Sequence, residues 1–206
     1  GFPGYDPTEA KKLSEYDIEL ARKLLAEAGY PDGKGFPKLE LWMRGEEQIM
    51  AWQKPASIYI QAHFKEALGV DIIPRDIESK TFTDALNKHT HNFFLLAYQF
   101  DYVDPSNFMD LFLTGGRHAW SNPEYDGLVL EADSSEDWEK RIENYRKAEK
   151  ILVQEVPAVF AFQQLSSAVW KPYLKGEGME PNKEGITSWG GMVEKYIQSH
   201  IYIAKH

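Results

Sequence analysis

A strand, a helix and a second strand follow one another between residues 38 and 73, and this succession constrains the fold more than any other feature of the sequence. Every second side chain in residues 39–44 is Leu or Met, which is the period of a strand with one buried face. Residues 48–68 have the apolar spacing of a helix, which Pro55 either kinks or starts late. After Gly69 ends that helix, residues 70–73 predict a short second strand. Strands joined through a helix pair in parallel, so the sequence predicts an α/β fold with a mixed sheet flanked by helices.

Residues that start and stop helices delimit the other elements. Asp17 can cap a first helix, and Gly29 ends it because glycine readily adopts the left-handed conformation found after helices. Ser134 and Asp137 open the longest helix, predicted from near residue 135 to residue 155, and Pro157 stops it. The expected buried face of that helix consists of Ile142, Tyr145, Ala148, Leu152 and Val156. The remaining predicted elements are helices at 79–86 and 124–133, a fully covered strand at 92–98, one or two strands at 158–170, and a final strand at the C-terminus.

Composition argues against several classes of function. The net charge of −9 repels phosphate backbones, so nucleic acid is not an expected partner. The chain has no cysteine, which excludes disulfides and thiolate metal sites. The sequence has no phosphate loop, dinucleotide fingerprint, serine-nucleophile elbow or zinc-protease helix, so we expect neither an enzyme nor a bound cofactor. No apolar run approaches the ~20 residues of a membrane-spanning helix.

Two histidines, His89 and His91, have the spacing that places two imidazoles on one face of a strand. A metal ion would need further ligands, and no third ligand is apparent from the sequence. We therefore favour a solvated histidine pair over a metal site.

An aromatic and acidic segment, residues 98–108, follows the apolar run, and ligands of α/β sheets collect beyond the carboxyl ends of strands. Asp104 precedes Pro105 and is explained locally as a helix cap. Asp101 lacks such a role, and a carboxylate among aromatic side chains is costly to desolvate unless a cation or several hydrogen bonds meet it. A ligand ammonium would serve, as would a neighbouring arginine or another turn. The two carboxylates also leave open a hydrolase that acts through Asp101 and Asp104.

Several segments, in the same order along the chain, resemble one protein family. DIELARKLLAEAGYPDGKGFPKLEL is similar to the helix, EAGYPDG turn and strand of the solute-binding proteins of oligopeptide, dipeptide and nickel ABC importers, which form extracellular solute-binding protein family 5. YQFDYVDPSNF resembles their aromatic-x-x-Asp-Tyr-x-Asp-Pro segment. NPEYDGLVLEAD and DWEKRIENYRKAEKILVQEVPAVFAF resemble two of their helices, and KPYLKG with IYIAKH resembles their C-terminus.

The resemblance implies a lobe of the type II periplasmic-binding-protein fold, in which two lobes close on a solute and deliver it to a membrane permease. Residues 1–170 would form the C-terminal lobe, and residues 171–206 the tail that returns to the N-terminal lobe. The implied partners are a peptide or similar small solute, the ABC permease, and the N-terminal lobe of a longer parent protein. The implied location is periplasmic or extracellular, with a lipid anchor left open for the parent. We expect a lone lobe to bind solute weakly or not at all.

The same resemblance implies candidate ligand-binding residues. In peptide-binding members, the aspartate of the aromatic segment pairs with the free α-ammonium of the peptide, and that position is Asp101 here. The aromatic residue three positions earlier is usually Trp and is Tyr98 in this chain, a departure that changes the expected pocket wall. Phe100, Tyr102 and Trp120 are further candidate walls from composition and neighbourhood, for which a core or surface role fits equally well. Relatives that carry sugars, nickel chelates or opines leave the solute open, and a module that docks the permease through its acidic surface is a further alternative.

Overall fold

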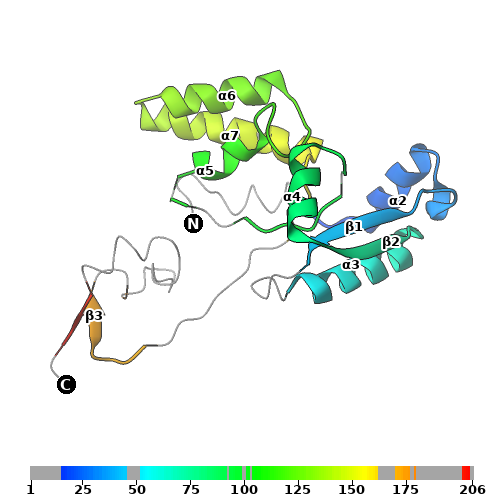
Figure 1. Cartoon of the computed structure of the whole chain (residues 1–206). Coiled ribbons are helices and arrows are strands. Elements are labelled where there is room, and N and C mark those ends of the chain that lie inside the picture. Colours follow the sequence, from blue (N-terminus) through cyan, green and yellow to red (C-terminus); the bar gives the residue numbers. More distant parts are fainter. Residues whose placement is uncertain are drawn as a thin grey trace. The chain divides into compact units, whose positions relative to one another are not determined.

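The computed structural model describes residues 15–45, 52–91, 93–98, 101–102, 104–161, 170–176, 179 and 201–204. The chain divides into two compact units (Figure 1). The described residues from 15 to 98, with 112–123, form the parallel-sheet unit; those of 101–111 and from 124 onward form the helix-pair unit. Both units combine helices and strands, as the predicted α/β class requires.

The parallel-sheet unit is built on the predicted strand–helix–strand succession. β1 (Leu39–Arg44) and β2 (Ile72–Ile77) pair in parallel, and α3 (Gln53–Leu68) connects them. Because α3 begins at its Gln, Pro55 lies in the first turn, where its missing N–H removes no helical hydrogen bond. β2 begins two residues later than predicted, and α4 (Ser79–Asn87) follows it as the predicted short helix.

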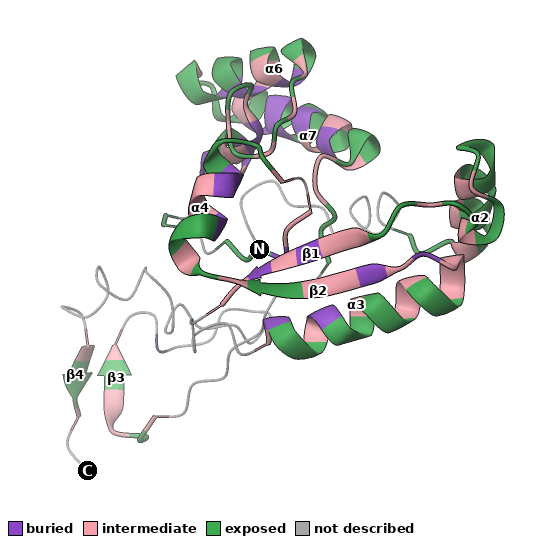
Figure 2. Ribbon diagram, turned by 45° about the vertical axis from the view of Figure 1, so that its right-hand side comes forward, coloured by how far each residue is buried: buried purple, intermediate pink, exposed green. Residues whose placement is uncertain are grey.

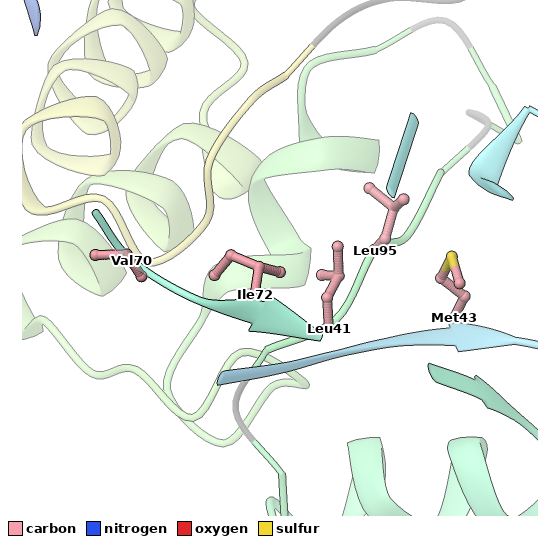
Figure 3. Packing of buried hydrophobic residues seen from close by; sticks show 5 residues of the cluster. All are labelled: Leu41, Met43, Val70, Ile72 and Leu95. Carbon is pink, nitrogen blue, oxygen red and sulfur yellow. The ribbon is translucent and has the colours of Figure 1, made fainter. Parts of the chain in front are cut away.

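Alternate residues of β1 are buried, as their period predicts, with Leu41 and Met43 exposed by only 2% and 3%. The register of the sheet sets Leu39 opposite Ile72, so apolar side chains of both strands meet on one face. Figure 3 shows the resulting cluster, which consists of Leu41, Met43, Val70, Ile72 and Leu95. Side chains of α3 pack against this cluster and complete the core, among them Ile60, Phe64 and Leu68.

α2 (Ile18–Glu27) begins and ends where the sequence predicts. The carboxylate of Asp17 accepts a 2.9 Å hydrogen bond from the backbone N–H of Leu20 and so caps the helix. Gly29, two residues after the last helical residue, has a φ of 95°, which confirms the predicted stop.

The apolar run at residues 93–98 is not the fully covered strand that its composition predicts, and residue 92 lies outside the described residues. Phe94 forms an isolated parallel bridge with Trp42, whose backbone bonds both neighbours of Phe94. Leu95 is buried, but Tyr98 is 42% exposed. Residues 93–95 are buried or half-buried, whereas residues 96–98 are exposed, so the apolar composition of the segment predicts more burial than the structure shows.

The helix-pair unit contains α6 (Pro123–Ser134) and α7 (Trp138–Glu155), which lie side by side in Figures 1 and 2. α6 confirms the predicted helix at residues 124–133. α7 begins at residue 138 rather than near 135, because Asp137 caps it by accepting hydrogen bonds from the backbone N–H groups of Glu139 and Lys140. Figure 2 shows buried residues along both helices, and those of α7 include Ile142, Tyr145, Ala148 and Leu152, as predicted.

Val156 departs from the predicted buried face of α7. It follows the last helical residue with a φ of 51° and is 55% exposed. The helix ends before Pro157, as predicted, so Val156 has left the helical register that would have buried it.

Two strands near the C-terminus, β3 (Leu174–Gly176) and β4 (Ile201–Ile203), form an antiparallel pair. β4 confirms the predicted final strand. The prediction of strands at 158–170 is wrong for residues 158–161, which have no regular structure and no partner strand in the described chain; residues 162–169 lie outside it. None of the helices among the described residues combines the length and the apolar character needed to span a membrane.

Candidate functional site

The predicted ligand-binding residues are divided between the two units. Tyr98 and Trp120 belong to the parallel-sheet unit, whereas Asp101 and Tyr102 belong to the helix-pair unit. Phe100 lies outside the described residues. Tyr98 and Tyr102 are 42% and 49% exposed, Asp101 is exposed, and Trp120 is half-buried. The described candidates therefore form two pairs, and Asp101 shares its compact unit with Tyr102.

Buried polar side chains hold the turn that carries Asp101. The backbone N–H of Asp101 donates a 3.1 Å hydrogen bond to the amide oxygen of Asn107, which is buried. The backbone N–H of Asn107 donates in turn to the carbonyl oxygen of Asp104, also at 3.1 Å. The hydroxyls of Tyr102 and Ser106 lie 3.2 Å apart and share a hydrogen bond. We call residues 101, 102 and 104–107 the Asp101 turn. Hydrogen bonds within the turn hold its backbone, whereas the residue Asp101 is exposed.

Asp104 has the capping role that its place before Pro105 predicts. Its carboxylate accepts a 2.9 Å hydrogen bond from the backbone N–H of Ser106, the first residue of α5 (Ser106–Met109), and forms a 2.6 Å ion pair with Arg141. Partial burial opposes ionisation of Asp104, but hydrogen bonds from Ser106 and the charge of Arg141 outweigh it and lower the pKa of this carboxyl. A carboxyl group that stays ionised is a poor proton donor, which argues against a hydrolase with Asp104 as its general acid.

Arg141 joins the Asp101 turn to α6 and α7. Its Nη2 bonds Asp104, and its Nη1 donates to the carbonyl oxygens of Ala132 and Asp133 at 3.1 and 3.4 Å. Its guanidinium lies over the ring of Tyr145, 5.1 Å from the centroid. Sequence reasoning missed Arg141 as part of the site. The available signal was its spacing of four from Tyr145, which places both side chains on one face of a helix.

A second pair of interacting carboxyls consists of Asp110, which follows α5 directly, and Asp133, which lies in the last turn of α6. Asp110 opens the short helix η3 (Asp110–Phe112), and Asp133 accepts a hydrogen bond from the hydroxyl of Tyr145. Loss of hydration, with repulsion from Asp133 and a hydrogen bond to it, raises the pKa of Asp110 to about 6. Asp110 therefore gains or loses its charge in a pH range where ordinary carboxyl groups are ionised.

His89 and His91, considered above as a possible metal pair, contact different backbone carbonyl groups. Nε2 of His89 lies 3.0 Å from the carbonyl oxygen of Gly116, and Nε2 of His91 lies 2.8 Å from that of Glu40. The ring of His91 stacks on Trp42 with 4.2 Å between centroids. The prediction of solvated histidines is confirmed for His89, which is exposed, but is wrong for His91, which is half-buried. Over the described part of the chain, no group of three or more His, Cys, Asp or Glu side chains is placed to hold a metal ion.

Trp120 lies in the loop between η3 and α6. Hydroxyls of Thr114 and Ser121, 2.9 Å apart, share a hydrogen bond that joins the two ends of this loop. His118, in the same loop, stacks on Phe112 with 4.0 Å between ring centroids. The loop thus has internal contacts of its own, and a half-buried Trp120 fits a packing role as well as a ligand wall.

Comparison with known proteins shows to which family the chain is similar. Residues 1–120, more than half of the chain, match the family described as bacterial extracellular solute-binding proteins, family 5 Middle. The chain belongs to this family. Membership in family 5 confirms the resemblance drawn from the sequence motifs.

Curated relatives of family 5 are similar over most of this chain. The periplasmic murein peptide-binding protein MppA of Escherichia coli (strain K12) is 29% identical over 175 residues, which cover 83% of this chain and 32% of MppA. The oligopeptide-binding protein OppA of Bacillus subtilis (strain 168) is 28% identical over 181 residues, or 84% of this chain and 32% of OppA. The chain thus spans 32% of the length of each of these relatives, which are named as binding proteins.

Solved structures of family 5 proteins share the fold. The Escherichia coli murein tripeptide binding protein MppA matches with a TM-score of 0.69 and 27% identity, over 100% of this chain and 38% of that chain. Haemophilus influenzae OppA, in complex with RPPGFSPFR, matches with a TM-score of 0.68 and 25% identity, over 91% and 35% of the two chains. These likenesses confirm the predicted type II periplasmic-binding-protein fold.

Proposed function

We propose that this chain is part of the solute-binding component of an ABC importer that captures peptides for delivery to a membrane permease. The observation that carries the proposal is Asp101, an exposed carboxylate on a turn whose backbone is held by buried side chains. A carboxylate on a fixed backbone suits a ligand with a free ammonium, because charge-assisted hydrogen bonds are short and directional. The names of relatives support a peptide: MppA is a murein peptide-binding protein, and OppA of Haemophilus influenzae has been solved with RPPGFSPFR.

In the proposed site, Asp101 pairs with the ammonium of the peptide. Tyr98, Phe100, Tyr102 and Trp120 would supply aromatic walls for the rest of the ligand. The 42% and 49% exposure of Tyr98 and Tyr102 supports this role, since both side chains keep surface that a ligand can cover.

The proposed division of the chain follows from the same function. Residues 1–170 would act as the C-terminal lobe, and residues 171–206 as the tail that returns to an N-terminal lobe. Within the proposed tail, β3 and β4 pair with each other in a small antiparallel sheet. Capture would occur by closure of the two lobes, because a ligand that contacts both lobes favours the closed state. The names of relatives such as MppA support a periplasmic location.

Calorimetric titration tests the proposal in the full-length protein that contains this chain. A library of dipeptides and oligopeptides, with free or acetylated N-termini, is titrated into the wild type and into the Asp101→Asn variant. We expect binding only with a free amine, and loss of the charge in Asp101→Asn should weaken it by about 2 kcal/mol or more, roughly thirtyfold. Asp76→Asn is the matched control, since Asp76 is an exposed aspartate of β2 and undergoes the same charge change.

Two outcomes would change the proposal. Equal binding by the wild type and Asp101→Asn would remove Asp101 as the anchor of the ligand. Failure of every peptide, with binding of a sugar or a nickel chelate instead, would keep the family and overturn a peptide as the solute.

A further inference from the structure

The Asp101 turn owes its shape to side chains more than to regular secondary structure. Residues 101, 102 and 104 belong to no helix or strand, and α5 has only four residues. A helix of one turn has too few hydrogen bonds to be stable alone. The position of Asp101 must therefore be set by contacts with longer elements.

A continuous set of hydrogen bonds leads from α7 to Asp101. Arg141 bonds the carboxylate of Asp104 at 2.6 Å. The same carboxylate accepts the backbone N–H of Ser106, while the carbonyl oxygen of Asp104 accepts the backbone N–H of Asn107. The amide oxygen of Asn107 then accepts the backbone N–H of Asp101 at 3.1 Å. Ser106 and Asn107 are 8% and 6% exposed, so water cannot readily replace these partners.

The Arg141 end of this set is well anchored. α7 has 18 residues and a buried face, and the ion pair with Asp104 leaves the two side chains only 16% and 24% exposed. Arg141 also bonds the carbonyl oxygens of Ala132 and Asp133 near the C-terminus of α6, where the helix dipole favours a positive charge. The planar guanidinium can make these bonds at once because its donors form a fixed fork.

We infer that Arg141 is the positioning residue of the proposed ligand site: it holds the Asp101 turn against α6 and α7, so that Asp101 meets the ligand ammonium in a fixed geometry. The identity of the ligand in this inference rests on the proposed function, whereas the positioning rests on the contacts of Arg141. Arg141 itself need not touch the ligand, because it acts through Asp104 and Asn107.

The test compares three variants in the full-length protein: Arg141→Gln, Arg141→Lys and the control Lys140→Gln. Lys140 is the matched control because it also links α7 to α6, through a 2.6 Å ion pair with Glu131, but has no bond to the Asp101 turn. The first measurement is amide hydrogen exchange at Asp101 without ligand, with Ile72 in the core of the parallel-sheet unit as reference. The second is the affinity ratio between a free-amine peptide and its N-acetylated form.

We expect Arg141→Gln to accelerate exchange at Asp101 about tenfold relative to Ile72 and to reduce the affinity ratio by a similar factor. Loss of folding alone would lower the amount of active protein without changing that ratio. Arg141→Lys keeps the charge but loses the fork, so a smaller change in both measurements is expected, and it replaces the Gln variant if that variant does not fold. Lys140→Gln should change neither.

Unchanged exchange at Asp101 in both Arg141 variants would overturn the inference, and so would an unchanged affinity ratio alongside faster exchange. If the wild type shows no preference for a free amine, the proposed function fails. The exchange measurement then still decides whether Arg141 holds the turn.

Discussion

At the scale of single residues, partners rather than residue type decide the charge of the acidic side chains. Asp104 faces Arg141 and the N–H of Ser106, and its pKa is lowered. Asp110 lies near another carboxyl, Asp133, and loses hydration, so its pKa is raised to about 6. Ionisation of Asp104 therefore stabilises the folded chain, whereas ionisation of Asp110 destabilises it.

The Asp110→Asn variant should be more stable than the wild type at neutral pH. The pKa of Asp110 is about 6 in the folded chain against 3.8 as its usual value, so protonation favours the folded state below about pH 4, and that stabilisation is lost as the pH rises through about 6. The Asn side chain is neutral at every pH, so the variant avoids the destabilisation that the ionised Asp110 causes. Since Asp110 keeps much contact with water, we expect a gain of about 1 kcal/mol above pH 7, and none at pH 4.

Urea unfolding between pH 4 and pH 8 measures this difference. Asp76→Asn again serves as the control for removing one exposed carboxylate, and the change in stability that it causes is subtracted at each pH. A gain for Asp110→Asn that is the same at pH 4 and pH 8 would show that repulsion by Asp133 is not its cause.

The predictable part of the site is the part decided by neighbours in the sequence. Asp104 could be predicted as a cap because Pro105 follows it directly. Its ion pair could not, because Arg141 lies 37 residues further along the chain and only folding brings the two together. The hydrogen bond from the backbone N–H of Asp101 to the amide oxygen of Asn107 likewise has no distinct signal in the sequence.

At the scale of elements, the clearest constraint is the close approach between the end of α3 and the turn after α2. Gly69 follows α3 with a φ of 71°, and a Cβ there would collide with the carbonyl oxygen of Asp32. A Cβ at Gly33, also at φ 71°, would lie 2.6 Å from the carbonyl oxygen of Leu68. Both glycines are therefore needed for space as well as for backbone conformation.

Gly69→Ala and Gly29→Ala form a matched pair that separates these two effects. Both glycines follow a helix with positive φ, but a Cβ at Gly29 would meet nothing within 4 Å. We expect Gly29→Ala to lower the free energy of unfolding by about 1 kcal/mol, from backbone strain alone, and Gly69→Ala to lower it by about 3 kcal/mol. Chemical unfolding of both variants provides the comparison, and equal losses would contradict a steric role for Gly69.

Elements could be predicted from the sequence where their ends have local signals. Asp17 and Gly29 bound α2 as predicted, and Pro157 ends α7. The strand predicted at 92–98 was wrong over its described part, because a strand needs a partner along its length and this segment bridges β1 only at Phe94. Strand formation is thus decided by the rest of the fold, which local composition does not report.

At the scale of the whole molecule, the chain spans 32% of the length of its relatives MppA and OppA. Capture by closure requires ligand contacts from two lobes, and the proposed anchor Asp101 accounts for one end of a peptide only. The binding free energy should therefore be shared with residues outside this chain.

The most direct measurement is the affinity of one free-amine peptide for the full-length protein and for this chain alone, by calorimetry under the same conditions. We predict clear binding by the full-length protein and weak or absent binding by the chain. Equal affinity of the two would contradict capture by closure of two lobes, and absence of binding by both would contradict peptide capture itself.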